Sequence, residues 1–321
     1  MRKTLNRERI EGLVYEHDLK IKQVQNTDSK NYGKDFISGT LDIATDDACE
    51  NIVQVHFTYV TEVTSKGKKN DTYTALKNII DNGKTVISDG ASAATMVRID
   101  TAIGVNDFYS DNAKNDNNPE GLVSAKRNEG GFVHIITKMN EESSRNTFEV
   151  DMLINGTRFV EANEDTGADE YLILKGVIFD FKGAILPVEF SVRSAGGIKY
   201  FEGLDINKDN MIFTKVWGKI VSHQSKVTRT EQSAFGEDKV VEYTKTQKEW
   251  VVVGAANEPY ELGDSQNGIT VDELKKAVED RNVYLADIKK RQEEYQASKN
   301  ADNPAPKASA GVSAAMGGFN F

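Results

Sequence analysis

One short segment of the sequence combines an aromatic ring with positive charges at a spacing that suits a charged and planar ligand. Lys215, Trp217 and Lys219 take alternate positions in the run 211–221, and alternate side chains of a β-strand share one face. A ring that stacks on a base and ammonium groups that neutralise phosphates are the contacts with which proteins hold single-stranded nucleic acid. The alternative that the residues leave open is a half-buried tryptophan whose neighbouring lysines reach past it to water.

Other cations and aromatic residues lie in predicted loops or at outward positions of predicted strands. The turn-rich loop 26–34 leads into a strand whose polar face carries Phe36, and the hairpin 223–248 carries cations on both arms. Taken singly, each cation is equally compatible with an ordinary exposed position. Phe179 and Phe181 either pack between domains or stack on bases. The residues predicted to contact a single strand are Lys30, Tyr32, Lys34, Phe36, Arg98, Lys126, Arg127, Lys175, Phe179, Phe181, Arg193, Lys215, Trp217, Lys219, Lys226, Arg229, Lys245 and Lys248.

The elements that would position these side chains recur along the chain. The stretch 35–61 predicts two antiparallel strands, because apolar and polar residues alternate on both sides of a polar turn. The stretch 171–193 repeats this pattern, with Gly176 aligned on Gly39. A glycine within a strand marks a bulge or a bend, which lets a short sheet curl. We therefore expect a curled β-unit in each half of the chain.

Each repeat predicts the order strand, bent strand, strand, helix, strand, strand, with the helices at 72–80 and 197–204. This is the order of the OB-fold, a small barrel that binds oligonucleotides or oligosaccharides. Thr270 and Glu273 form a capping box before a long helical pattern. The predicted fold is therefore mainly β, with two tandem OB-like barrels. Its domains are a first barrel with loop insertions over 1–144, a second over 145–264, a C-terminal helix over 265–298 and a flexible tail over 299–321.

Residue content excludes several classes of protein. The 321-residue chain has one cysteine, Cys49, so it can form no internal disulfide and no cysteine-rich zinc site. The four histidines lack metal-ligand spacing, and no Ser, His and Asp set resembles a nucleophile site. No apolar run is long enough to span a membrane. We therefore predict a cytoplasmic protein (host cytoplasm if viral) that is not an enzyme, binds no metal or cofactor and has no membrane partner.

The net charge and the local distribution of charge bear differently on nucleic-acid binding. The net charge of −10 at pH 7 argues against a uniformly basic surface, although a local basic groove is compatible with it. The N-terminus is basic, with Arg2, Lys3, Arg7 and Arg9. These residues form either a solvated arm or an extension that follows a bound strand.

Tandem OB-like units followed by a flexible tail resemble a phage-type or bacterial-type single-stranded DNA-binding protein. The residues that carry the resemblance are GTLDI and VQVHF, KGVIFDF and LPVEF, and Phe319 and Phe321. The resemblance implies that the protein coats and protects single-stranded DNA in replication, recombination and repair. It also implies that Phe319 and Phe321 recruit replication or recombination proteins. The acids that precede the tip in that family are missing, since the nearest acid here is Asp302.

The competing interpretation is a viral structural or assembly β-protein that binds no nucleic acid. The net negative charge favours this alternative. Aromatic residues and cations that share strand faces favour the binding of a single strand.

Overall fold

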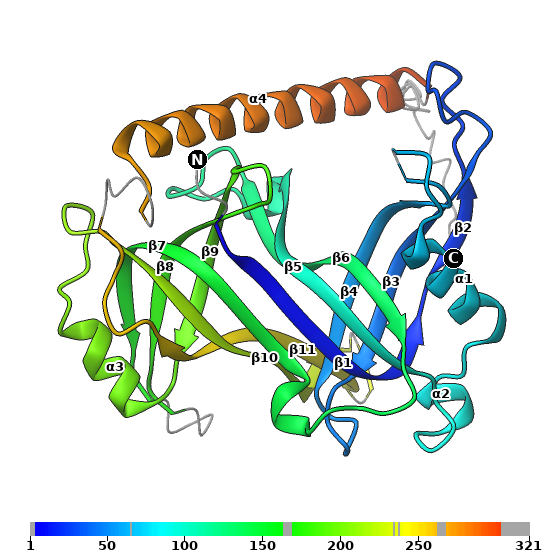
Figure 1. The fold of residues 1–321 in the computed structure, drawn as a ribbon, viewed down its shortest axis with the longest axis horizontal. Coiled ribbons are helices and arrows are strands. Elements are labelled where there is room, and N and C mark those ends of the chain that lie inside the picture. The colour runs from blue at the N-terminus through cyan, green and yellow to red at the C-terminus, as the bar shows by residue number, and fades with distance from the viewer. Residues whose placement is uncertain are drawn as a thin grey trace, which may run out of the picture. The chain divides into compact units, whose positions relative to one another are not determined.

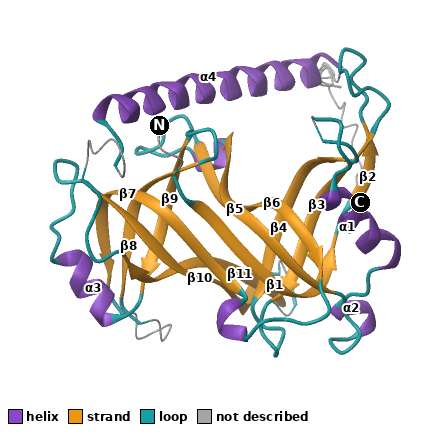
Figure 2. Ribbon diagram, viewed as in Figure 1, coloured by secondary structure: helices purple, strands orange, loops and turns teal. Residues whose placement is uncertain are grey.

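The computed structural model describes residues 4–64, 66–162, 169–233, 235–236, 238–261 and 268–302. The fold is mainly β, as predicted (Figure 2). The strands are β1 (Asn6–His17), β2 (Lys20–Gln23), β3 (Asp35–Ala44), β4 (Ile52–Thr61), β5 (Met96–Tyr109), β6 (Leu122–Ile135), β7 (Asn146–Val160), β8 (Tyr171–Phe179), β9 (Ile185–Val192), β10 (Ile212–Glu231) and β11 (Lys239–Ala255). The helices are α1 (Asp71–Asn82), α2 (Val86–Asp89), η1 (Asp111–Ala113), η2 (Glu142–Ser144), α3 (Ala195–Glu202) and α4 (Val271–Asp302).

The strands pair into one sheet that closes on itself twice. The first ring runs β1-β3-β4-β6-β5 and returns to β1, and the second runs β7-β8-β9-β11-β10 and returns to β7. When the strands of each ring are counted in chain order, the third and the fifth are parallel neighbours. These pairs are β4 with β6 and β9 with β11. Helices α1 and α2 follow the third strand of the first ring, and α3 follows that of the second. This is the order of elements that the sequence predicts for each repeat.

The two rings are joined by backbone pairing as well as by the chain segment 136–145. β1 pairs antiparallel with β7, from Asn6 opposite Val150 to Ile10 opposite Asn146. In Figure 1, β1 (blue) runs between the strands of the two rings. Strands β10, β7, β1, β5 and β6 therefore follow one another as neighbours, and their outer faces belong to both rings.

The predicted bend at Gly39 is confirmed. Its φ is 135°, and the register of β3 against β4 shifts between Ile37 and Gly39. A Cβ at this position would lie 2.6 Å from Asp18 Oδ1, so a side chain would be strained by both the backbone angle and the contact. The glycine thus lets β3 turn from β4 toward β1 and close the first ring.

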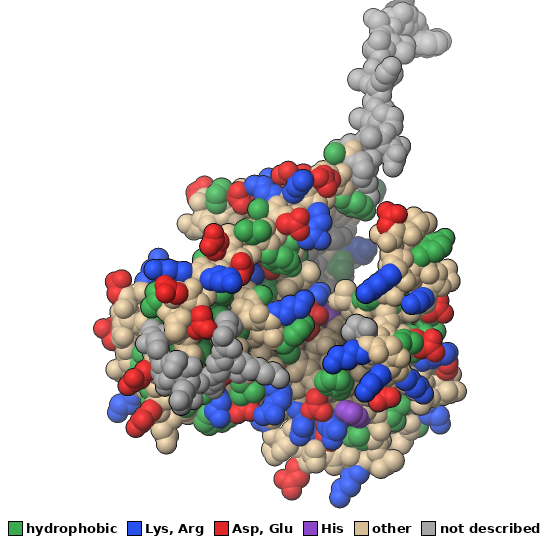
Figure 3. Space-filling model, turned by 45° about the horizontal axis from the view of Figure 1, so that its top comes forward, with side chains coloured by type: hydrophobic (Ala, Val, Ile, Leu, Met, Phe, Trp, Pro, Cys, Tyr) green, Lys and Arg blue, Asp and Glu red, His purple; other side chains and the backbone are tan. Residues whose placement is uncertain are grey.

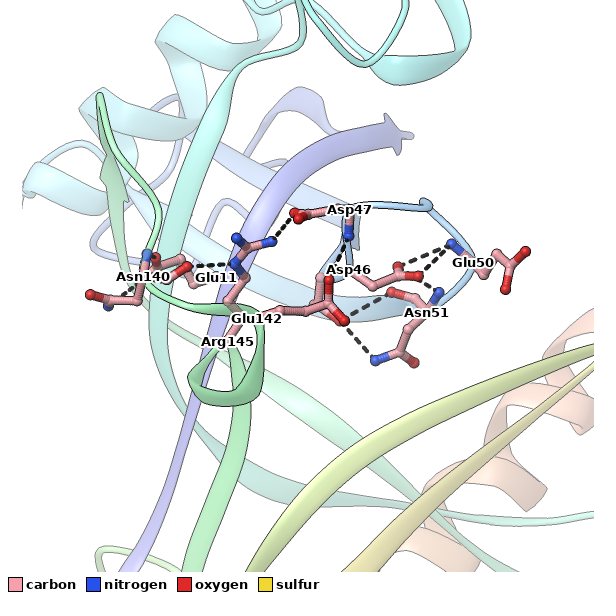
Figure 4. A network of polar contacts seen from close by, with 9 residues as sticks. Glu11, Asp46, Asp47, Glu50, Asn51, Asn140, Glu142 and Arg145 are labelled. Carbon is pink, nitrogen blue, oxygen red and sulfur yellow. Dashed lines mark hydrogen bonds and ion pairs between the residues drawn. The ribbon is translucent and has the colours of Figure 1, made fainter.

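A polar network around the buried Glu11 and Arg145 lies where the chain leaves the first ring for the second (Figure 4). The Arg145 guanidinium donates to the Asn140 carbonyl at 2.7 Å and to Asp47 at 2.6 Å. The Glu11 carboxylate accepts from the Asn140 side chain at 2.8 Å. Asn51, in the turn before β4, donates to the carbonyl of Ile220 on β10 at 3.2 Å. These contacts tie β1 and the β3–β4 turn to the start of β7 and to β10.

We expect Arg145→Ala to lower the free energy of unfolding by about 1–3 kcal/mol, because it removes a buried guanidinium together with its hydrogen bonds to the Asn140 carbonyl and to Asp47. Asp47→Ala is the matched control. The Asp47 side chain is 73% exposed, so its loss should cost less than about 1 kcal/mol. Urea unfolding of both variants measures the difference, and an equal loss in the two would contradict the structural role of Arg145.

The C-terminal helix begins with the predicted capping box. Thr270 Oγ1 accepts from Glu273 N at 3.2 Å, and the Glu273 carboxylate accepts from Thr270 N at 3.0 Å. Residues 107–123 and 279–321 form a second unit, separate from 1–106 with 124–278. In its described part, Arg281 pairs with Asp107 at 2.8 Å. The predicted boundary at 144 and 145 falls in the chain between η2 and β7 and stays a prediction.

Candidate nucleic-acid interface

A cleft of about 580 Å³ lies over the outer faces of β1, β7, β10 and β11. Lys215, Trp217 and Lys219 line it together, as their alternation on β10 predicts. The other lining residues are Arg7, Arg9, Thr147, Phe148, Glu149, Gly218 and Val253. The cleft therefore places one indole among two lysines and two arginines, in a chain whose net charge is −10.

Trp217 is held against the sheet but keeps an open face. Its indole lies on β11 at Gly254, where a Cβ would come within 2.5 Å of the ring. Any larger residue at 254 would displace the indole from the strand. Trp217 remains 38% exposed, and Lys215 Nζ lies 5.8 Å from its ring centroid. Both interpretations of this residue thus hold in part: the indole is half-buried, and its free face is available for stacking.

One carboxylate sits among the cations of the cleft. Glu149 pairs with Arg7 at 2.7 Å and with Lys215 at 3.1 Å. Burial acts to raise the pKa of Glu149, but Arg7 and Lys215 together lower it, so the group is ionised. Lys219 donates to the carbonyl of Ser143, and burial lowers its pKa. Since one carboxylate is shared between two cations, the cleft carries excess positive charge.

The same outer surface continues across β1 into the first ring. Lys219 is opposite Thr147, Thr147 is opposite Arg9, and Arg9 is opposite Asp100 on β5. Asp100 accepts from Arg9 at 2.9 Å and lies 3.4 Å from Arg98 Nε. Arg98, a predicted contact, is thus placed near this surface, with its charge partly offset by Asp100.

Arg7 and Arg9 are further binding candidates, for which the sequence left open a solvated arm or an extension that follows a bound strand. The structure places them within β1, where Arg7 is opposite Glu149. Their neighbours Glu8 and Ile10 are fully buried, so the arginines point outward. The alternation of Arg7 and Arg9 with Glu8 and Ile10 could have indicated that the two arginines share one face of a strand. The pairing of β1 with β7 is not visible in the sequence.

A second group of aromatic residues lies on the second and third strands of the first ring. Phe36 on β3 contacts Tyr59 on β4 with ring centroids 4.7 Å apart. Asn31, in the loop before β3, donates to the Tyr59 hydroxyl at 3.3 Å and accepts from Lys34 at 3.3 Å. Tyr32, in the same loop, is 56% exposed. The predicted group Lys30, Tyr32, Lys34 and Phe36 lies in this loop and strand, and Tyr59 is an addition that sequence spacing did not indicate.

Phe179 lies on the face of β8 opposite Ile178, as expected, but this face is covered, so Phe179 packs within the protein and offers no ring to a base. Its side chain is fully buried and meets Phe213 edge-on, with ring centroids 6.4 Å apart. The outer face at this end of β8 is covered by a small core that includes Ile269 and Ala277. Phe181, two residues further, is 83% exposed in the β8–β9 turn, with Lys182 Nζ 5.3 Å from its ring centroid.

Several predicted cations already have partners in the protein. Lys126 donates to the Glu189 carbonyl and lies over the rings of Phe190 and Trp250, so it is no simple surface contact. The other pairs are Arg127 with Glu129 at 2.6 Å, Lys175 with Glu189 at 3.4 Å, Arg193 with Glu249 at 2.8 Å, and Lys248 with Gln54 at 2.9 Å. Each of these side chains has its own hydrogen-bond or ion-pair partner, whereas Arg7 and Lys215 of the cleft share the single carboxylate of Glu149. These residues are therefore weaker candidates than those of the cleft.

Some predicted residues cannot be placed. The side chains of Lys226, Arg229 and Lys245, in the β10–β11 hairpin, lie outside what the structure describes. Phe319 and Phe321 lie outside the described residues altogether. Figure 3 shows lysine and arginine side chains intermixed with acids over one face of the molecule.

Within the described ranges, no group of three or more His, Cys, Asp and Glu residues could hold a metal ion. Helix α4 and the other described helices are not apolar and long enough to cross a membrane.

Comparison with known proteins identifies a family. A sequence model described as YorF matches residues 5–294. The chain belongs to the YorF family. No curated protein matches this YorF-family chain. Among solved structures, a deletion mutant of the single-stranded DNA binding protein from Thermus aquaticus matches 83% of the YorF-family chain and 100% of its own length, with 9% sequence identity and a TM-score of 0.46.

Proposed function

We propose that this YorF-family protein binds single-stranded DNA, by stacking a base on Trp217 and neutralising phosphates with the cations of its cleft. One observation carries the proposal: Trp217 keeps a free face and shares the cleft with Arg7, Arg9, Lys215 and Lys219. An indole surrounded by cations supplies both contacts that sequence-independent binding of single strands requires.

The architecture supports the same proposal. Each ring has the strand order of the OB-fold, with a helix after the third strand, and we interpret the rings as two OB-like barrels. OB-folds bind oligonucleotides across the second and third strands. In the first ring those strands are β3 and β4, which carry Phe36 and Tyr59. We interpret this aromatic group as an additional contact for the same ligand.

The proposed binding of single strands suggests a role for the protein in the cell. We propose a binding protein rather than an enzyme, which coats and protects single strands in replication or recombination. Recruitment of partner proteins by Phe319 and Phe321 stays a prediction, since both lie outside the described residues.

Titration of the protein with oligo-dT at a series of salt concentrations tests the proposal. Affinity should fall with salt by a slope of about −0.7 in log–log terms for each phosphate neutralised, and so by about −2 for three contacts. Duplex DNA of the same length should bind much more weakly, because its bases are not free to stack on Trp217. Affinity that does not depend on salt, or that is equal for duplex, would contradict the mechanism and favour the structural-protein alternative.

A further inference from the structure

The cleft is one end of a row of outward side chains that crosses from the second ring into the first. The row begins on β10 with Lys219, passes Thr147 on β7 and Arg9 on β1, and reaches Asp100 on β5. Paired residues of antiparallel strands project on the same side of the sheet. The row therefore lies on one continuous outer surface, although its residues come from both rings.

Phe132 on β6 stands at the far end of this row. Gly131, which precedes Phe132, lies so close to β5 that a Cβ at this position would be 2.0 Å from the Asp100 carbonyl oxygen. His134, two residues further on β6, lies 3.9 Å from the Asp100 carboxylate, so its side chain is on the outer surface. Phe132 shares the face of His134, because Val133 between them is buried. Phe132 is 72% exposed and is thus an aromatic ring turned to solvent.

An exposed aromatic ring offers a stacking face for any base, and Phe132 presents such a ring on the same surface as the cations of the row. The surface between it and the cleft is rich in arginine. Arg9 and Arg98 share one carboxylate, Asp100, as Arg7 and Lys215 share Glu149. Phosphate oxygens can take over from these carboxylates as partners of the guanidinium groups, since both bind the same planar donor set.

We propose that a single DNA strand lies across both rings on this surface, with one base on Trp217, another on Phe132 and the intervening phosphates on Arg7, Arg9 and Arg98. This inference rests on the proposed function and adds its path and its second stacking residue. The row crosses the spacings β10–β7, β7–β1, β1–β5 and β5–β6, each about 4.8 Å, so it spans roughly 19 Å along the sheet. A strand that contacts both aromatic residues must therefore run across the β-strands and must exceed a minimum length.

The test compares variants over a length series of oligo-dT, from about 4 to about 16 nucleotides, the range that one OB-fold covers. Trp217→Ala should weaken binding at every length. Phe132→Ala should leave the affinity for the shortest oligonucleotide unchanged and weaken that for the longest about tenfold. Phe132→Tyr should restore it, because the ring is kept. Phe159→Ala is the matched control, because Phe159 is an exposed phenylalanine at the end of β7 that is opposite Leu172 of β8 and lies outside the row. This variant should bind as the unaltered protein does at all lengths.

A direct reporter complements these affinities. The protein that combines Trp217→Phe with Phe132→Trp moves the exposed indole to the far end of the row, and its fluorescence should respond to long oligonucleotides and not to the shortest. Unaltered affinity of Phe132→Ala at every length, beside weakened Trp217→Ala, would overturn the path while leaving the proposed function intact. Absence of salt-dependent binding in the unaltered protein would overturn both.

Discussion

Trp217→Ala is expected to weaken the binding of oligo-dT by at least about tenfold. Stacking on an aromatic side chain is worth about 1–3 kcal/mol per base, and Trp217 supplies the indole of the cleft. No charge is removed, so the salt dependence of the affinity should keep its slope. Trp217→Phe retains a ring on the same strand face and should lose much less. Fluorescence anisotropy of a labelled oligonucleotide measures all three proteins on one scale.

The same experiment can be made independent of the label. The chain has two tryptophans, and the other, Trp250, is only 2% exposed. Quenching of intrinsic fluorescence by DNA should therefore come from Trp217. Trp217→Phe should abolish the quenching while Trp250→Phe retains it. Equal affinity of Trp217→Ala and the unaltered protein would remove the cleft from the binding site.

The second large effect concerns stability and pH. Glu8 lies on the inner face of β1 and is fully buried, with Oε1 accepting from Trp250 Nε1 at 2.8 Å. Its Oε2 is buried without a hydrogen-bond partner among the described residues. Burial raises the pKa of Glu8 to about 8, although the Trp250 hydrogen bond and the Lys126 ammonium act to lower it. The folded protein therefore holds a neutral carboxyl at pH 7.

The sign of the pH effect follows from this proton. In the unfolded chain Glu8 ionises near its ordinary pKa of 4.5, so between about pH 4.5 and pH 8 unfolding releases a proton. The contribution of Glu8 to the free energy of unfolding consequently falls as pH rises through this window and is constant above it. Burial also lowers the pKa of Lys126 to about 7, so Lys126 keeps its charge over most of the range from pH 5 to pH 7.

Glu8→Gln should remove this dependence, because an amide oxygen still accepts from Trp250 and does not titrate. Between pH 5 and pH 7 the unaltered protein should lose about 2–3 kcal/mol of stability relative to the variant, at about 1.4 kcal/mol per pH unit. Urea unfolding at several pH values measures both proteins. Parallel stability curves for the two would show that Glu8 is ionised in the folded state.

Local sequence patterns predicted the features that depend on one or two strands. Alternation placed Lys215, Trp217 and Lys219 on one face, and Gly39 predicted a bend, because both properties arise within a strand. Phe179 was wrongly assigned because the residues that cover it, Ile269 and Ala277, lie far along the chain. The order of elements in each repeat was recoverable for the same local reason.

Non-local pairing explains what the sequence could not indicate. Arg7 and Arg9 join the cleft only because β1 pairs with β7, which no local pattern encodes. Arg193 has the composition of a phosphate contact, but Glu249, on another strand, neutralises it. Exposed cations and paired cations look alike in a sequence, so a list of basic residues overestimates the binding surface.

The backbone ladder between β1 and β7 bears on how tightly a long ligand can be held. Two binding modules on a flexible tether gain from each other only as far as the tether keeps the second near the first, and that effective concentration falls as the tether lengthens. Here the chain segment between the rings is not their only junction, because β1 and β7 themselves pair. A ligand engaged by one ring meets the other at a fixed distance and orientation, without the loss of interdomain freedom that tethered modules undergo on binding.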